Sequence, residues 1–305
     1  MSIFEELNGA YPVRKTRAQK AAFREWALEK GRGFGWQGCE EKGGSSTNVV
    51  FGDPDTAACV FTAHYDTPPR MPFPNICTPA SIFMFILAQG GIVLAMLAGA
   101  IILGAAIALA TRNIEVSILI SDAALLAFSA LMMFGPANPS CANDNTSGTA
   151  AVLEIMSRIP ESMRTKAAFV LFDNEEKGML GSGAFKKKHP VVKNEKLLIN
   201  MDCVGDGGYM FMLANKKTRA LPLYGELTAC LSAADGCELI LHDMEKGIYP
   251  SDQSGFRFGV GVCACTKGRY MGYYFSKIHT AKDTVCEQRN LDFLACGIAD
   301  FIEKI

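Results

Sequence analysis

One long uncharged tract limits what this chain can fold into. No charged residue occurs from Met71 to Thr111, and this tract is longer than the roughly 20 residues with which an α-helix spans a bilayer. A second apolar run, Val116–Phe134, follows a short polar connection and carries one charge, Asp122. Glycines in the first run leave room for close helix packing. The pattern predicts a helical hairpin that crosses a membrane and returns, with helices at about 80–110 and 115–134.

Two other interpretations of the tract stay open, a buried core hairpin and an apolar dimer interface, because Asp122 weakens the second span. Asp122 could instead pair with Gln89 or with a serine inside the hairpin. A hairpin returns both of its ends to the same side, so the flanking sequences can join. We therefore expect residues 1–70 and 136–305 to form one discontinuous domain, and residues 71–135 to be an insertion in it.

Composition excludes some classes of function. The 305 residues carry a net charge of −1, which gives no sign of nucleic-acid binding. The 11 cysteines are an odd number without metal-binding Cys-x-x-Cys spacing, so reduced and mostly buried thiols are expected. The segment Met1–Pro12 has no apolar stretch like that of a secretory signal. With the basic residues between Arg14 and Arg24, this predicts a multi-pass protein of the cell membrane whose catalytic domain is cytoplasmic.

The pattern of the polar part of the chain predicts an α/β domain. Arg14–Lys30 has a helical pattern whose charges we expect to form a solvated face. Continuous apolar runs at Ala57–Thr62 and Ala167–Phe172 are typical of buried strands, and Thr149–Ile159 between them is an amphipathic helix. This alternation predicts a largely parallel sheet with helices on its faces. Phe256–Tyr274 is expected to contain two short strands.

Candidate functional side chains follow several of these strands or occupy polar turns. They are His64, Asp66, Asp144, Glu175, Glu176, Asp202 and His279. Open α/β sheets build their sites at the carboxyl ends of strands, so these residues should meet at one edge. Two histidines and several carboxylates are ligands that suit a borderline metal such as Zn²⁺.

The spacing allows a two-metal site. Two ions held a few ångströms apart need a bridging carboxylate, and Asp144 lies in a polar turn that could hold one rigidly. His64 with Asp202 could complete one site, and His279 with Glu176 the other. Taken one by one, these residues also fit structural roles. His64 and His279 could be hydrogen-bonded histidines of the core, Glu175 and Glu176 a pair on the surface, and Asp202 the cap of a turn.

The remaining two residues are expected to act on the ligands and on water. In an extended segment, Glu175 and Glu176 would point in opposite directions and could not bind the same ion. Glu175 is therefore the expected general base, which takes a proton from water and delivers it to the leaving amine. Asp66, two residues beyond His64, should accept the other ring N–H of that histidine and hold its orientation.

These segments together resemble a known family. They are His64-x-Asp66, Asp144-Asn145-Thr146-Ser147-Gly148, Glu175-Glu176-x-Gly178, Asp202 and His279-Thr280-x-x-Asp283. The chain resembles the co-catalytic dizinc exopeptidases, of the bacterial leucyl aminopeptidase, aminopeptidase Y and glutamate carboxypeptidase type, in a membrane-inserted variant. The resemblance covers nearly all of the soluble part. It implies a phosphorylase/hydrolase-like three-layer α/β/α fold with a central mixed sheet, here interrupted by the hairpin. It also implies two Zn²⁺ bridged by Asp144 and the roles given above.

The resemblance also implies an activity. We expect a zinc-dependent aminopeptidase that removes N-terminal residues from peptides, with the bilayer contacted through the 80–134 hairpin. A glutaminyl cyclase-like transferase and a non-catalytic membrane scaffold are the alternatives. The segment Ser251–Phe256 resembles a family segment near the substrate pocket, but Gln253 stands where the family has a histidine. The oligomeric state stays undecided.

Overall fold

A mixed β-sheet of nine strands is the scaffold on which the other elements are arranged. The computed structural model describes residues 1–305. The strands are β1 (Gly38–Gly43), β2 (Ser46–Phe51), β3 (Cys59–His64), β4 (Ala167–Phe172), β5 (Leu197–Met201), β6 (Tyr209–Ala214), β7 (Glu238–Asp243), β8 (Phe258–Gly268) and β9 (Gly272–Tyr274). Their order is β1-β2-β4-β3-β5-β8-β6-β7, and β9 pairs with β8 alone.

The four central strands β4, β3, β5 and β8 run parallel to one another. The strands β3, β4 and β5 are buried along their whole length, as their nearly continuous apolar sequences require. Antiparallel pairs lie on both sides, β1 with β2 and β2 with β4 on one, and β6 with β8 on the other. The sheet is therefore mixed.

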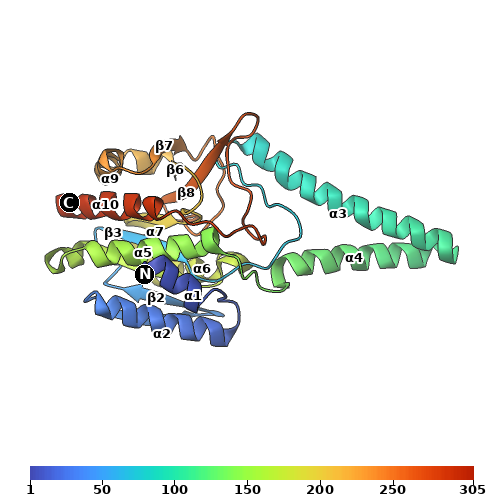
Figure 1. Cartoon of the computed structure of the whole chain (residues 1–305), viewed down its shortest axis with the longest axis horizontal. Helices are drawn as coiled ribbons and strands as arrows, with labels where there is room; N and C mark the ends of the chain where they lie inside the picture. Colours follow the sequence, from blue (N-terminus) through green and yellow to red (C-terminus); the bar gives the residue numbers. More distant parts are fainter.

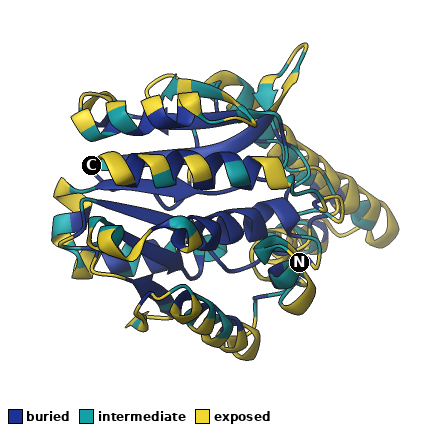
Figure 2. Ribbon diagram, turned by 60° about the vertical axis from the view of Figure 1, so that its left-hand side comes forward, coloured by how far each residue is buried: buried dark blue, intermediate teal, exposed yellow.

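Helices cover both faces of the sheet. The larger core lies between the sheet and α1 (Ile3–Ala10), α2 (Arg17–Gly33), α5 (Gly148–Arg158), α9 (Pro222–Ala233) and α10 (Gln288–Lys304). On the other face, α6 (Leu180–Lys188) and α7 (Pro190–Glu195) pack through Phe185 and Val192, and the short α8 (Lys216–Arg219) precedes α9. Figure 2 shows the buried strands between helices whose outer faces are exposed. The predicted three-layer α/β/α fold is confirmed.

Two long helices, α3 (Ile82–Thr111) and α4 (Ile114–Phe134), project from one end of this domain as a hairpin (Figure 1). Both are long and apolar enough to cross a membrane. They pack where Gly104 lets them approach closely, and the Ser117 hydroxyl donates to the Gly104 carbonyl at 2.5 Å. Most other side chains of the pair are exposed, so the interpretation as a buried core hairpin is wrong.

The alternative in which Asp122 pairs with Gln89 is excluded. The Gln89 amide donates to the Asn75 side chain at 3.2 Å and to the main-chain oxygen of Ile76 at 3.1 Å. Asp122 lies on α4 with its side chain exposed. Gln89 therefore ties α3 to the segment that leads into it, and not to α4.

Two further predictions are corrected in the N-terminal and C-terminal parts. Arg14 precedes α2 and is fully buried, donating to the Tyr65 carbonyl and to the Thr146 hydroxyl. Lys20 is also buried, with its ammonium 2.5 Å from Asp173. These two charges are internal, not part of a solvated face. At the other end, Phe256–Tyr274 contains two strands as predicted, the short β9 and β8, but β8 is longer than expected, at eleven residues.

Candidate metal centre

The carboxyl ends of neighbouring parallel strands bring three of the candidate segments together. His64 is the last residue of β3 and is fully buried. Asp202 follows β5, while Glu175 and Glu176 follow β4 in the 3₁₀ turn Glu175–Lys177. Because β4, β3 and β5 are adjacent and parallel, these side chains meet at one edge of the sheet.

The turn before α5 holds Asp144 against this edge. The main-chain N–H groups of Asn143 and Asp144 donate to the two carboxylate oxygens of Asp283, at 2.8 and 3.0 Å. The Asn145 side chain accepts from the N–H of Gly148 at 3.0 Å and donates to the carbonyl of Met201 at 3.0 Å. A Cβ at position 148 would lie 2.2 Å from that carbonyl, which explains the glycine there. These hydrogen bonds hold the turn in place and leave the carboxylate of Asp144 free for other contacts.

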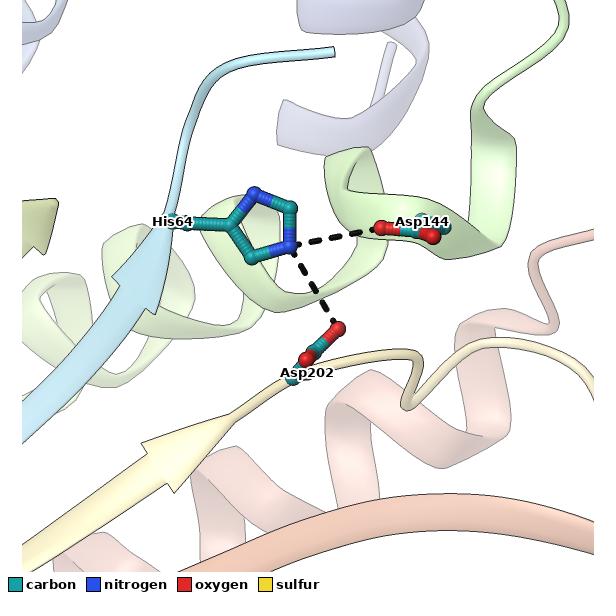
Figure 3. Close-up of side chains that lie close together, drawn as sticks. All are labelled: His64, Asp144 and Asp202. Atoms are coloured by element: carbon teal, nitrogen blue, oxygen red, sulfur yellow. Dashed lines mark ion pairs between the residues drawn. The ribbon is translucent and has the colours of Figure 1, made fainter. Parts of the chain in front are cut away.

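One oxygen of Asp144 faces His64. The Nε2 atom of His64 lies 3.3 Å from Oδ1 of Asp144 and 3.5 Å from Oδ1 of Asp202, and both carboxylates point at the same ring nitrogen (Figure 3). Asp202 is itself held by the Ser251 hydroxyl, which donates to its Oδ2 at 2.6 Å. The three side chains are nearly inaccessible to solvent.

The other oxygen of Asp144 faces a second group. Nε2 of His279 lies 3.0 Å from Oδ2 of Asp144 and 3.5 Å from Oε2 of Glu176. His279 comes from the loop between β9 and α10, with a φ of +60°. The carboxylate of Asp144 therefore lies between two histidine–carboxylate pairs.

The residues present fit a cation. The potential ligand atoms of His64, Asp144 and Asp202 lie within 4.8 Å of one another, and so do those of Asp144, Glu176 and His279. Nε2 of His64 and Oε1 of Glu176 are buried without a hydrogen-bond partner. Buried polar atoms normally have partners, so these orphaned atoms are consistent with ligands to an ion. Imidazole and carboxylate donors suit zinc.

Asp66 connects the first histidine with the glutamate turn. Nδ1 of His64 lies 3.2 Å from the main-chain oxygen of Asp66 and 3.5 Å from its Oδ1. The carboxylate of Asp66 also accepts from the N–H groups of Glu175 and Glu176, at 3.0 and 3.3 Å. Since these glutamates begin a 3₁₀ turn, the assumption that they lie in an extended segment is wrong. Carboxylate oxygens of both lie within 4.8 Å of a ring nitrogen of His64.

Burial and mutual repulsion control the acids at this edge. Burial raises the pKa of Glu175 well above its usual value, against the opposing effect of His64. Burial also raises the pKa of Asp252 to about 7, and neither of its carboxylate oxygens has a hydrogen-bond partner. For Asp144, burial acts in the same direction, but His279 and His64 together hold the pKa below its usual value. The site thus combines one carboxylate held ionised with others that favour the protonated form.

Sequence reasoning gave no role to three residues that shape the site. Asp283 lies in the recognised His279 segment and fixes the Asp144 turn, as described above. Asp252 and Ser251 belong to the segment that resembles the substrate region, and this resemblance was the signal that could have identified them.

Gln253 in the same segment lies buried, accepts from the Asn200 amide at 3.1 Å and donates to the carbonyl of Tyr249 at 2.7 Å. It therefore supports a pocket residue, since Tyr249 lines the pocket and Gln253 does not.

A cavity of about 220 Å³ opens over the cluster. Its floor includes Asp144, Glu175, Glu176, Asp202 and His279. The remaining walls come from the loops after β5, β7 and β9 and from the segment that begins the hairpin. A small substrate group bound there would lie against every predicted ligand except His64, which is covered.

Solved structures share this fold. A zinc-dependent exopeptidase from Parabacteroides distasonis matches with a TM-score of 0.60 at 14% identity, over 99% of this chain and 96% of that chain. A leucine aminopeptidase precursor from Bacteroides thetaiotaomicron matches with a TM-score of 0.59 at 13% identity, over 100% and 96%. Glutaminyl cyclase from Porphyromonas gingivalis matches with a TM-score of 0.62 at 15% identity, over 99% and 97%. At such identities the likeness establishes the fold.

A comparison with curated protein sequences finds no match. The model of peptidase family M28 matches residues 128–295, more than half of the chain. The matched range contains Asp144, Glu175, Glu176, Asp202 and His279 and begins beyond His64 and Asp66, which β3 brings to the same edge from the other side of the hairpin. This chain is therefore a member of peptidase family M28.

Proposed function

We propose that the protein is a zinc-dependent aminopeptidase that removes N-terminal residues from peptides. One observation carries the proposal. The two carboxylate oxygens of Asp144 face separate histidine–carboxylate pairs, His64 with Asp202 and His279 with Glu176, as a carboxylate that bridges two metal ions must. Membership of a peptidase family and the zinc-dependent exopeptidase among the similar structures support the same reading.

We assign each ion one imidazole and one carboxylate of its own, with Asp144 shared. Zinc bound at these residues would polarise the scissile carbonyl and lower the pKa of water. Asp66 holds the ring of His64 on one side and the main chain of Glu175 on the other. It therefore positions a ligand and the general base in relation to each other.

Glu175 is the proposed general base. It lines the cavity beside the predicted ligands, and burial raises the pKa of its carboxyl group toward the range where a base can both accept and return a proton. Its carboxylate would take the proton of the attacking water and give it to the amine that leaves. Glu176, bound to the second ion, would have no part in this transfer.

The glutaminyl cyclases among the similar structures favour one alternative, intramolecular cyclisation of an N-terminal glutamine. That reaction releases ammonia and leaves the peptide one piece, whereas an aminopeptidase releases a free amino acid. Incubating a glutaminyl peptide and measuring both products therefore separates the two activities on a single sample.

We further propose that the hairpin spans a membrane and that the catalytic domain is cytoplasmic. A pocket beside the residues that follow β4, at the same edge as the base of the hairpin, is lined by Lys15, Arg17, Arg24 and Lys177, besides the internal pair of Lys20 and Asp173. At the distal connection between the helices, the only charged residues are Arg112 and Glu115, one of each sign. Positive residues concentrate on the cytoplasmic side of membrane proteins, which supports this orientation.

The first experiment measures metal content by plasma mass spectrometry on detergent-purified protein, together with release of fluorophore from a panel of aminoacyl substrates, with and without chelator. About two zinc ions per chain and release that chelator abolishes are expected. A fully metallated protein that releases neither amino acid nor ammonia would refute the enzymatic proposal and leave the scaffold interpretation.

A further inference from the structure

The hairpin supplies part of the wall of the catalytic pocket. Phe85 and Gln89, in the first eight residues of α3, line the same cavity as the predicted metal ligands. Asn75 and Cys77, in the segment that leads into α3, line it as well. An insertion that served only as an anchor would have no need to reach the reacting groups.

This wall is attached to the loop that carries His279. Main-chain N–H groups of Cys77 and Phe275 donate to each other's carbonyls, at 2.9 and 3.0 Å. The N–H of Met71 donates to the carbonyl of His279 at 2.6 Å. Phe85 packs against the small apolar cluster that Cys77 and Phe275 share. The hairpin entrance and the His279 loop therefore form one connected structure.

The length of α3 accounts for its reach into the pocket. Its 30 residues extend about 45 Å, whereas the hydrocarbon core of a bilayer is about 30 Å thick. The 21 residues of α4 match that thickness. Since the two helices meet at their distal ends, roughly the first ten residues of α3 remain on the side of the catalytic domain. Phe85 and Gln89 both lie in this excess length.

The wall has a definite hydrogen-bonding character. Both N–H groups of the Gln89 amide are used, one by Asn75 and one by the carbonyl of Ile76, so its Oε1 is left to accept. The Asn75 side chain accepts from Gln89 through Oδ1, and its NH₂ group is left to donate. Two residues that are hydrogen-bonded to each other and line the cavity thus keep one acceptor and one donor free, the two kinds of group that a peptide bond pairs with.

The rest of the wall carries no charge. Apart from the metal cluster, the cavity is bounded by Phe85, Tyr249, Phe275 and Ile278 together with the two amides and small uncharged residues. A charged substrate side chain would lose its hydration there without gaining a partner. The cavity of about 220 Å³ also limits the size of that side chain.

We propose that the start of α3 is a substrate subsite: Phe85 bounds the space for an uncharged terminal side chain, and the Asn75–Gln89 pair hydrogen-bonds the first peptide group. This inference rests on the proposed peptidase activity. The substrates are then peptides with an uncharged N-terminal residue, presented where the catalytic domain meets the membrane. Phe85 and Gln89 determine selectivity and substrate affinity, and leave the chemical step to the residues of the metal centre.

Two pairs of variants test the proposal in the full-length protein in detergent. Phe85→Ala is compared with Phe83→Ala, the same substitution on the same helix at a residue that is 73% exposed and does not line the cavity. Gln89→Ala is compared with Leu87→Ala, which is 58% exposed. Metal content is measured in each, because a subsite variant should keep the metal of the wild type.

Phe85→Ala should shift the ratio of kcat/KM for phenylalanyl over alanyl substrates by about tenfold toward the larger residue. Phe85→Trp should shift it in the opposite direction, so a misfolded alanine variant does not leave the question open. Gln89→Ala should raise KM about 3- to 10-fold at unchanged kcat. Free leucine has no peptide group, so its affinity in calorimetric titration should not change in this variant.

The outcomes are distinct. Wild-type protein that holds metal but neither cleaves any substrate nor binds leucine would refute the proposed function itself. Active wild-type protein in which Phe85→Ala and Phe85→Trp keep the selectivity of Phe83→Ala would overturn the subsite while leaving the peptidase intact. A uniform loss of kcat with loss of metal would also overturn it, because the hairpin would then only support the metal centre.

Discussion

The carboxylate of Asp66 accepts a hydrogen bond from the main-chain N–H of Glu175 at 3.0 Å, while Nδ1 of His64 lies 3.5 Å from the same oxygen. One side chain thereby fixes the distance between β3 and the turn that follows β4. Asp66 is neither a proposed metal ligand nor the proposed base, yet it contacts both the ligand His64 and the base Glu175.

Replacing Asp66 with Asn should therefore affect metal and turnover together. Its amide nitrogen would face an N–H group that needs an acceptor, and the ring of His64 would keep only the main-chain oxygen of residue 66 as a partner for Nδ1. We expect activity or zinc affinity to fall about 10- to 100-fold, the usual cost of losing a residue that orients a ligand. Zinc titration and kcat measure the two effects. Asp235→Asn, an exposed aspartate, is the control and should change neither.

The two adjacent glutamates should respond differently to the same substitution. Glu175→Gln removes the proposed base and should lower turnover by on the order of 10²–10⁴-fold while the metal is retained. Glu176→Gln removes a proposed ligand and should lower the metal content. Plasma mass spectrometry and an aminoacyl-fluorophore assay on both variants decide between them. Metal loss in the Glu175 variant alone would show that the two assignments must be exchanged.

The stability of the domain should depend on pH through His189. Burial acts to lower the pKa of this histidine, but Glu41 at 2.9 Å and Asp55 at 2.8 Å outweigh it and raise the pKa above its ordinary value. Because the folded state binds the proton more tightly, the stabilisation is complete below the unfolded pKa of about 6.5 and is lost as the pH rises through the raised value.

Thermal melting in detergent at a series of pH values checks this expectation. The melting temperature of the wild type should fall relative to that of His189→Asn as the pH is raised from about 6.5. His242→Asn is the matched control, because it makes the same substitution at a histidine that forms no ion pair. Parallel curves for the wild type and His189→Asn would contradict the prediction.

The packing of the hairpin should depend on a single glycine. A Cβ at Gly104 would lie 2.2 Å from the hydroxyl of Ser121, whereas one at Gly99 would meet nothing within 4 Å. Gly104→Leu should therefore separate α3 from α4 and lower the melting temperature in detergent, and Gly99→Leu should not. Disulfide trapping between cysteines introduced on the two helices would report the separation directly. Equal behaviour of the two variants would mean that the helices are held by their ends alone.

Much of this molecule could be predicted because its signals are local. The apolar runs of β3 and β4 and the amphipathic pattern of α5 fix those elements within one or two residues. The predicted ligands were recognisable because each stands at a strand end or in a polar turn, and chemistry of this kind collects where parallel strands end.

Other features were unpredictable because they depend on contacts between distant parts. The sequence around Lys20 predicts a solvated basic helix, yet the ammonium of Lys20 forms a buried ion pair with Asp173, which is distant in the sequence. Glu175 and Glu176 follow a strand, but they lie in a 3₁₀ turn whose N–H groups donate to the distant carboxylate of Asp66. The partners of Gln89 in the segment before α3 could not be read from the sequence, which offered Gln89 only as one alternative partner of Asp122.

The continuity of α3 has one more consequence. The helix runs without interruption from the wall beside Phe85 to the far end of the hairpin. A helix adapts to a thinner or thicker bilayer by changing its tilt, at a cost of fractions of a kcal/mol per ångström of mismatch. If the hairpin spans the membrane as proposed, such a tilt would be passed to the pocket wall and to the His279 loop attached to it. The thickness of the surrounding bilayer would then change the shape of the pocket, and with it the preference among peptide substrates.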